Sequence, residues 1–220
     1  MGEQDRAGSV TVFLVRHGET PYHAENRYAG RSDIPLTDRG HAQALELAEW
    51  ASEAGLTGIV ASPLCRARMT AEPAARKTGL PLLLDERLVE LDFGAAEGLT
   101  SQEMWERFPQ ARAAFEEDPY ANPLPDGESP SAARDRGRAV IDELAQQRLA
   151  SHQVGHRVLV VAHSTFLRIV MCDLLGVPLS RYRAVFPVIR NATGAVLRHR
   201  AGAWGLIAWN PPLSAGAHTW

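Results

Sequence analysis

The stretch of the chain with the clearest chemical potential is Arg16-His17-Gly18-Glu19-Thr20, directly after the apolar run 10–15. That run (VTVFLV) is rich in β-branched residues and predicts a strand buried on both faces. Ligands of open α/β sheets bind beyond the carboxyl ends of the strands, which is where His17 falls. A neutral imidazole is a nucleophile at pH 7, and an arginine beside it can neutralise an anion. His17 is therefore a candidate for attack on a phosphate, and a histidine that caps a turn is the alternative.

A second histidine, His163, follows the apolar run 158–162 (VLVVA) in the same topological position. Two histidines at the carboxyl ends of two buried strands arise by chance much less often than one. We expect Ser164 or Thr165 to cap the helix that follows, whose N-terminal N–H groups can bind an anion. Taken without His17, an ordinary turn residue is an equally good interpretation of His163.

The elements that must position these residues alternate along the chain. Short apolar runs predict strands at 10–15, 58–62, 82–84 and 158–162, with one or two more within 195–209. Helical spacing predicts helices at 37–55, 64–78 (disturbed by Pro73), 129–150 and 166–175. Residues 99–128, with prolines, aromatic residues and many acids, predict short helices that form a cap. The alternation indicates an α/β fold with a mostly parallel sheet.

Four blocks of sequence, in order, resemble the signatures of one family. They are RHGET at 16–20, DIPLTDRGHA at 33–42, SPLCRARMTA at 62–71 and LVELDFGAAEG at 88–98. These blocks are similar to the RHG, D-x-P-L-T-x-x-G, S-x-L-x-R-A-x-x-T-A and L-x-E-x-D-F-G-x-x-E-G stretches of the histidine phosphatase (phosphoglycerate mutase-like) superfamily. With the His163 segment, the resemblance covers roughly residues 10–98 and 129–200. It implies a three-layer α/β/α fold with a small helical cap insertion.

The resemblance also implies a role for each of five residues. His17 would be the nucleophile that becomes a phosphohistidine, and Glu90 the general acid and then base. Arg16, Arg66 and His163 would surround the phosphoryl group and keep His17 neutral by lowering its pKa. Permanently charged guanidiniums can neutralise the equatorial oxygens without a metal. We therefore expect neither a metal nor a cofactor.

The chain departs from the family pattern at two positions of the phosphate site. His23 stands where many members have an asparagine that contacts phosphate, and Asn26 could assist it. Ser164 replaces the usual glycine after the second histidine. Besides Arg16, Arg66 and His163, we expect the phosphate-binding residues to be His23, Asn26, Ala29, Gly30 and Ser164.

Three functions are compatible with these residues. The leading one is a metal-independent phosphatase that acts on a small phosphorylated metabolite. A mutase is the alternative, because residues 25–30 (ENRYAG) resemble the ENRFSG of phosphoglycerate mutases. Against a mutase, residues 99–128 contain seven acids and only Arg107 and Arg112, a net charge of −5 that disfavours a doubly anionic substrate. A catalytically dead binding module is the third, and the presence of all five catalytic candidates argues against it.

Length and composition limit the remaining possibilities. The 220 residues, 45% hydrophobic with net charge −3, predict one domain over 1–220 with a flexible segment 1–9 and a tail at 211–220. The slight acidity argues against nucleic-acid and anionic-membrane binding. Cys65 and Cys172 are far apart, which suits a reducing compartment, and no signal peptide or membrane span is evident. We therefore expect a cytoplasmic protein, with a homodimer as one option.

Overall fold

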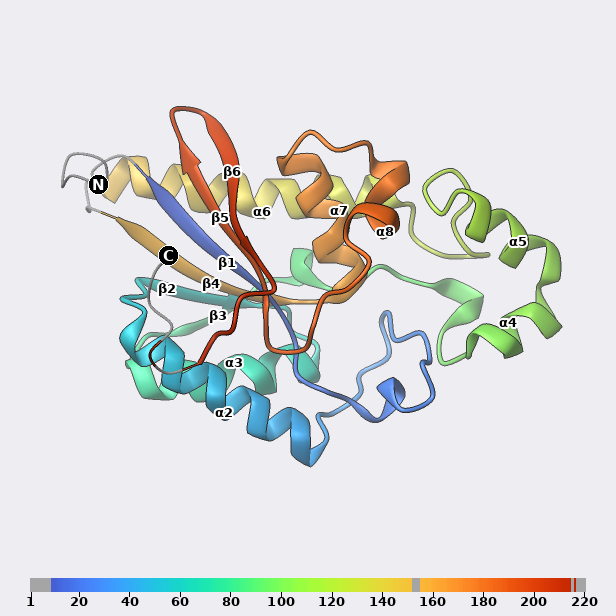
Figure 1. Cartoon of the computed structure of the whole chain (residues 1–220), viewed down its shortest axis with the longest axis horizontal. Coiled ribbons are helices and arrows are strands. Elements are labelled where there is room, and N and C mark those ends of the chain that lie inside the picture. The colour runs from blue at the N-terminus through green and yellow to red at the C-terminus, as the bar shows by residue number, and fades with distance from the viewer. Residues whose placement is uncertain (1–8, 152–154, 215, 217–220) are drawn as a thin grey trace.

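A six-stranded mixed sheet forms the centre of the computed structural model, which describes residues 9–151, 155–214 and 216 (Figure 1). The strand order is β3-β2-β4-β1-β5-β6, with bounds β1 (Val10–Arg16), β2 (Gly58–Ala61), β3 (Leu82–Leu84), β4 (His156–Ala162), β5 (Gly194–Arg200) and β6 (Ala203–Trp209). The four strands from β3 to β1 are parallel, whereas β5 and β6 are antiparallel. The predicted mostly parallel sheet is therefore confirmed.

Alternate residues of the central strands belong to two separate hydrophobic cores. On β1, Phe13 and Val15 face the core shared with helices α2 (Asp38–Glu53) and α3 (Cys65–Thr78). Val12 and Leu14 face the opposite core, which is shared with α6 (Pro130–Ser151) and α7 (Ser164–Leu174). This alternation follows from the two-residue period of a strand. Figure 1 shows the two helical layers on either side of the sheet, as expected for an α/β/α fold.

The register between β1 and β4 determines where the two candidate histidines lie. Arg16 pairs with Ala162 at the carboxyl ends of these parallel strands. The His17 N–H continues the ladder by donating to the Ala162 carbonyl at 3.0 Å. His17 and His163, which are 146 positions apart in the chain, are thereby brought side by side.

Several element boundaries differ from the predictions for local reasons. Helix α7 begins at Ser164, two residues earlier than expected, with His163 as its N-cap. Pro73 lies inside α3 without breaking it. The predicted start of α6 is confirmed, because the Ser129 hydroxyl accepts from the Ala132 N–H at 3.2 Å. The segments 1–9 and 211–220 lie partly outside the described residues, and Ser9 is buried.

Residues 99–128 form two short helices at the end of the molecule where the parallel strands finish (Figure 1). Helix α4 (Ser101–Arg107) begins with a capping box between Thr100 and Glu103, and α5 (Pro109–Glu117) begins with a proline. Met104 and Phe115 anchor them in the core. A further short helix, α8 (Tyr182–Val185), lies on the same side as α7. In the described part of the chain, no helix has the length and apolarity needed to cross a membrane.

Candidate active site

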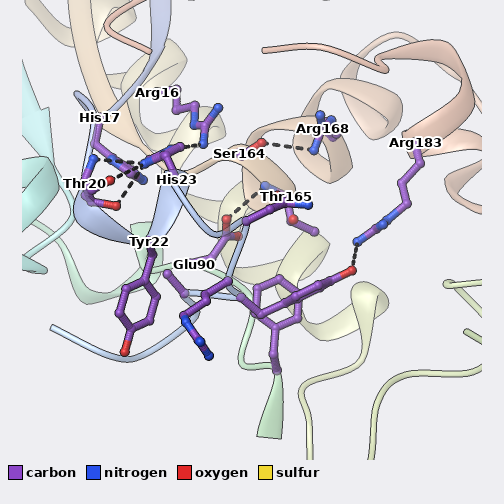
Figure 2. A pocket seen from close by; sticks show the side chains of 15 residues that line it. Arg16, His17, Thr20, Tyr22, His23, Glu90, Ser164, Thr165, Arg168 and Arg183 are labelled. Atoms are coloured by element: carbon purple, nitrogen blue, oxygen red, sulfur yellow. Dashed lines mark hydrogen bonds between the residues drawn. The ribbon is translucent and has the colours of Figure 1, made fainter. Parts of the chain in front are cut away.

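His17 lies at the base of a cavity of about 230 Å³ beyond the end of β1 (Figure 2). Its Nδ1 is 2.7 Å from the Gly18 carbonyl, which can only accept, so the ring proton is on Nδ1. The Nε2 lone pair remains for chemistry. Burial, the Arg66 charge and the Arg16 charge hold the pKa of His17 well below its usual range. The expectation of a neutral His17 is thus met, with burial as the largest cause.

The glycine after His17 serves the fold. A Cβ on Gly18 would lie 2.7 Å from the Gly40 carbonyl, at the start of α2. A Cβ on Gly40 would in turn lie 2.2 Å from the Glu19 carbonyl. The two glycines therefore allow the loop after β1 to press against the first turn of α2, which fixes the backbone around His17.

Arg16 has one buried nitrogen that makes no hydrogen bond to the residues that the structure describes. One Nη donates to the Ile189 carbonyl at 2.8 Å and the other contacts Nε2 of His23. The Nε–H is buried and has no hydrogen-bond partner in the described structure. Burial and the nearby Arg168 charge lower the pKa of Arg16 to about 10, so it remains a cation at neutral pH. An unsatisfied buried donor on a cation that lines the cavity is suited to an anion.

His23 makes the contacts expected of a positioning residue. Its Nδ1 lies 3.0 Å from the Thr20 hydroxyl and 3.1 Å from the Thr20 carbonyl. Its Nε2 faces donors from Arg16 and from Asn191, the latter at 3.3 Å. Burial and the Arg16 charge lower the pKa of His23. Its Nδ1 also accepts from the Thr20 N–H at 2.9 Å. The ring therefore lies between Thr20 and Arg16 with a contact at each nitrogen, as Figure 2 shows.

Arg66 and His163 lie next to His17, outside the cavity lining. The His163 ring centroid is 5.2 Å from that of His17, and both Arg66 and His163 are 0% exposed. Arg66 Nε donates to His163 Nδ1 at 3.2 Å, and His163 Nε2 is 2.8 Å from the Ser62 hydroxyl. Neither residue is among the residues that line the cavity. Arg66 acts on His17 electrostatically, because its charge lowers the pKa of that ring.

Ala29 and Gly30 contact this arginine through their backbone. Arg66 donates to the carbonyls of Gly30 at 2.7 Å, Ala29 at 3.0 Å and Ser32 at 2.6 Å. A Cβ on Gly30 would lie 2.5 Å from the Leu91 carbonyl. Of these residues only Ala29 lines the cavity. In the structure, Gly30 thus supports Arg66 through its carbonyl, and its contact with phosphate stays a prediction.

Glu90 occupies the N-terminus of α7. Its two carboxylate oxygens accept from the N–H groups of Thr165 at 2.9 Å, Phe166 at 2.7 Å and Leu91 at 2.8 Å. Figure 2 shows the bond from Thr165. The carboxylate is 4% exposed and lines the cavity. The prediction that Ser164 or Thr165 caps this helix was wrong, because the Glu90 carboxylate satisfies the helix N–H groups. The anion at this helix end comes from the protein itself.

The two remaining expected residues, Ser164 and Asn26, both line the cavity. The Ser164 hydroxyl accepts from Arg168 Nη1 at 3.0 Å. Asn26 is exposed and adopts a left-handed backbone conformation with φ 52°. Among the described residues, no three His, Cys, Asp or Glu side chains are arranged to hold a metal ion.

The lining of the cavity carries a net positive charge, whereas residues 99–128 have a net negative charge. Its lining contains Glu90 as its one acidic residue and four arginines, Arg16, Arg27, Arg168 and Arg183. None of the seven acids of 99–128 is in this lining. Glu103 pairs with the lining residue Arg27, whereas Glu116 pairs with Arg112 and Glu128 with Arg136, which are both outside the lining. The net charge of residues 99–128 therefore does not describe the charge of the cavity lining. Summing charge over a sequence segment ignores which way its side chains point.

Sequence reasoning missed Arg168, Arg183 and Tyr28. Arg168 had a signal, because it lies four residues after Ser164 and therefore shares its helix face. Arg183 belongs to the four-residue helix α8, which has no recognisable periodicity. Tyr28 lies within the stretch 25–30, but the pattern does not show that its hydroxyl accepts from Arg112 at 3.0 Å and Arg183 at 3.4 Å.

The fold and the residues of this site are those of the histidine phosphatase superfamily. Residues 12–212 match the model of the histidine phosphatase superfamily (branch 1), and the chain belongs to that family. A relative from Escherichia coli O1:K1 / APEC, named "Probable phosphoglycerate mutase GpmB", is 33% identical over 203 residues, covering 91% of this chain and 90% of the relative.

Two solved structures are similar to the chain. The first, titled mycobacterial hydrolase 1, has a TM-score of 0.84 at 29% identity and covers 92% of this chain and 99% of its own. The second is a mycobacterial glucosyl-3-phosphoglycerate phosphatase, with a TM-score of 0.82 at 28% identity, covering 93% and 100%.

Proposed function

We propose that the chain is a metal-independent phosphatase that hydrolyses a small phosphorylated metabolite through a phosphohistidine. One observation carries the proposal: His17 has its Nδ1 fixed by the Gly18 carbonyl, which leaves Nε2 free beside a cavity lined by Arg16 and Glu90. A nucleophile, a cation and a carboxyl group at one cavity are the parts that phosphoryl transfer through histidine needs. The similarity to a solved glucosyl-3-phosphoglycerate phosphatase supports the hydrolytic reaction.

In the first step, the His17 Nε2 lone pair forms a bond to phosphorus as the bond from phosphorus to the ester oxygen breaks. Glu90, in its protonated form, gives its proton to the leaving oxygen, so the alcohol departs neutral. Arg16 Nε–H, which has no partner in the described structure, stabilises charge on an equatorial oxygen. The products of this step are the alcohol, phospho-His17 and the Glu90 carboxylate.

In the second step, the Glu90 carboxylate removes a proton from water, whose oxygen attacks phosphorus. The bond from phosphorus to Nε2 breaks, inorganic phosphate departs and Glu90 is protonated again. His17 returns to its neutral form, which its lowered pKa favours. Buried Arg66 and His163 hold the charge and geometry around this ring without entering either bond change.

A mutase is the second candidate, and specific observations favour it as well. The relative named as a phosphoglycerate mutase is 33% identical, and residues 25–30 resemble a mutase stretch. Three arginines of the lining, Arg16, Arg168 and Arg183, have no carboxylate partner in the described residues, which counts against the charge argument that disfavoured a doubly anionic substrate. Incubation with 3-phosphoglycerate separates the two reactions, because a phosphatase releases inorganic phosphate whereas a mutase forms 2-phosphoglycerate.

The direct test is His17→Ala, assayed for phosphate release from p-nitrophenyl phosphate. We expect turnover below about one thousandth of the wild-type value, because the nucleophile is lost. His41→Ala is the matched control, since His41 is exposed on α2. EDTA is expected to leave wild-type turnover unchanged. Substantial turnover by His17→Ala would end the proposal.

A further inference from the structure

We propose that Arg168 and Arg183 form a subsite for a second anionic group, a carboxylate or a second phosphate, on the alcohol that leaves. The inference rests on the phosphatase function proposed above and names the substrate class: phosphomonoesters with an acidic group at the other end. Figure 2 shows Arg16, Arg168 and Arg183 in a row along one side of the cavity, with Arg183 at the end remote from His17.

Arg168 is held in place entirely by neutral acceptors. Its Nε donates to the Phe186 carbonyl at 2.6 Å, one Nη to the Pro187 carbonyl at 2.9 Å and the other to the Ser164 hydroxyl at 3.0 Å. No carboxylate pairs with it in the described structure. Burial and the nearby Arg183 charge lower the pKa of Arg168, and the Glu90 charge acts in the opposite direction. Both arginines line the same cavity, where Figure 2 shows them on the same side.

Arg183 has the same character. Its Nε donates to the Tyr182 hydroxyl at 3.3 Å and one Nη to the Tyr28 hydroxyl at 3.4 Å. The guanidinium stacks 4.7 Å from the centroid of Phe115, on cap helix α5. No ion pair joins it to a carboxylate in the described residues. The aromatic faces orient the fork without neutralising its charge.

Tyr28 adds a polar group to this end of the cavity. Its hydroxyl oxygen accepts from both Arg112 and Arg183, so the hydroxyl hydrogen is left to donate elsewhere. Burial alone would raise the pKa of Tyr28, but the Arg183 and Arg112 guanidiniums lower it overall. A lowered pKa makes the O–H a better hydrogen-bond donor, which suits an anionic acceptor.

Two neighbouring arginines differ from Arg168 and Arg183, because each of them is paired with a carboxylate. Arg27 lines the same cavity but pairs with Glu25 and Glu103, and Arg112 pairs with Glu116. The protein thus neutralises cations around the cavity where no ligand is needed. Arg168 and Arg183 hydrogen-bond only to neutral groups in the described residues, so their charges attract an anion that enters this end of the cavity. Since Arg16 already serves the reacting phosphate, the remaining pair is available for a second anionic group.

The test measures the binding of matched phosphomonoesters as competitive inhibitors of p-nitrophenyl phosphate hydrolysis. Two pairs differ only in a carboxylate against a hydroxymethyl group: 3-phosphoglycerate with glycerol 3-phosphate, and 6-phosphogluconate with glucitol 6-phosphate. A third pair, fructose 1,6-bisphosphate with fructose 6-phosphate, tests a second phosphate. In at least one pair we expect the wild type to bind the doubly anionic member about 10-fold more tightly or better, which is typical of charge-assisted hydrogen bonds.

Arg183→Gln is expected to reduce that preference to below about 3-fold in the same pair, and Arg168→Gln is the second variant. The matched control is Arg181→Gln, which removes the same charge from an exposed residue two positions away and is expected to retain the wild-type preference. A wild-type preference below about 2-fold in every pair, or a preference that both Arg183→Gln and Arg168→Gln retain, overturns the subsite.

The failure of the phosphatase proposal has a different signature. In that case the wild type does not hydrolyse p-nitrophenyl phosphate at all. The same affinity ratios are then read as dissociation constants by calorimetry, without interference from turnover. Hydrolysis with no preference for the doubly anionic ester in any pair would therefore contradict only the subsite proposal. A preference for the doubly anionic ester without hydrolysis would contradict only the proposed phosphatase reaction.

Discussion

At the inner end of the cavity the functional groups lie close to the main chain that carries them, whereas at the outer end they extend on long side chains whose partners are hydroxyl groups and loop carbonyls. His17 is fixed by the Gly18 carbonyl and the β1–β4 register, and Glu90 by three N–H groups. Arg168 and Arg183 extend on long side chains from α7 and α8. Groups close to the main chain are already in place before substrate binds, as catalysis requires. Groups on long side chains can adjust their position to the substrate that binds.

The largest effect expected from testing this comparison is at Glu90, on the inner end. Glu90→Gln removes the proton donor, and we expect kcat for an alkyl phosphate to fall about 100- to 1000-fold. The loss for p-nitrophenyl phosphate should be much smaller, since its leaving group needs little protonation. Steady-state kinetics on both esters check this, with Glu86→Gln at an exposed position as control. Equal losses on the two esters would assign Glu90 a different role.

The next effect is on stability, through the buried neutral histidines of the inner end. Burial, followed by the Arg66 charge, holds the pKa values of His17 and His163 well below the ordinary value. In the unfolded chain both titrate near pH 6.5, so below that pH the unfolded state binds protons that the folded state does not. The free energy of unfolding should therefore fall as the pH drops below about 6.5, by ~1.4 kcal/mol per pH unit for each histidine.

Urea unfolding between pH 7.5 and 5 measures this slope. His17→Ala should remove about half of the part due to the two histidines, whereas His41→Ala, at an exposed position, should leave the slope as it is. An unchanged slope in His17→Ala would mean that the ring is not held neutral by the fold.

The smallest effect is expected at His23, which connects the inner end to Arg16. His23→Asn removes the ring nitrogen that accepts from Arg16. One Nη of Arg16 is then available to phosphate, and we expect KM for p-nitrophenyl phosphate to fall about 2- to 5-fold. His41→Asn is the same chemical change at an exposed site. A clear rise in KM for His23→Asn would show that His23 itself binds phosphate.

The same comparison explains how far the sequence could predict the molecule. The strands, the flanking helices and the meeting of His17 with His163 follow from apolar runs and from the rule that parallel strands end at one edge. In the structure, Arg16 at the end of β1 pairs with Ala162 at the end of β4, so both strands do end at the same edge of the sheet. The inner end was predictable because short side chains at strand ends have little freedom of direction.

The outer end was not predictable, because long side chains choose their partners in three dimensions. Even beside His17, Arg66 donates to three carbonyls of the loop 29–32, partners that could not be predicted because this loop carries no periodic pattern. Arg183 sits on a helix of four residues, and the acids of 99–128 pair with local arginines. Each of these outcomes depends on which carbonyl or carboxylate lies within reach, and spacing along the chain does not contain that information.

The central claim is that His17 Nε2 takes the phosphoryl group, and rapid quenching tests it most directly. Wild-type protein mixed with a ³²P-labelled phosphomonoester and quenched in alkali should carry acid-labile label, approaching about one phosphoryl group per chain when dephosphorylation is slow. Peptide mapping should place the label on His17, and His17→Ala should carry none. Turnover that proceeds with no trapped label on His17 across the quench times, or with acid-stable label on another residue, would contradict the account.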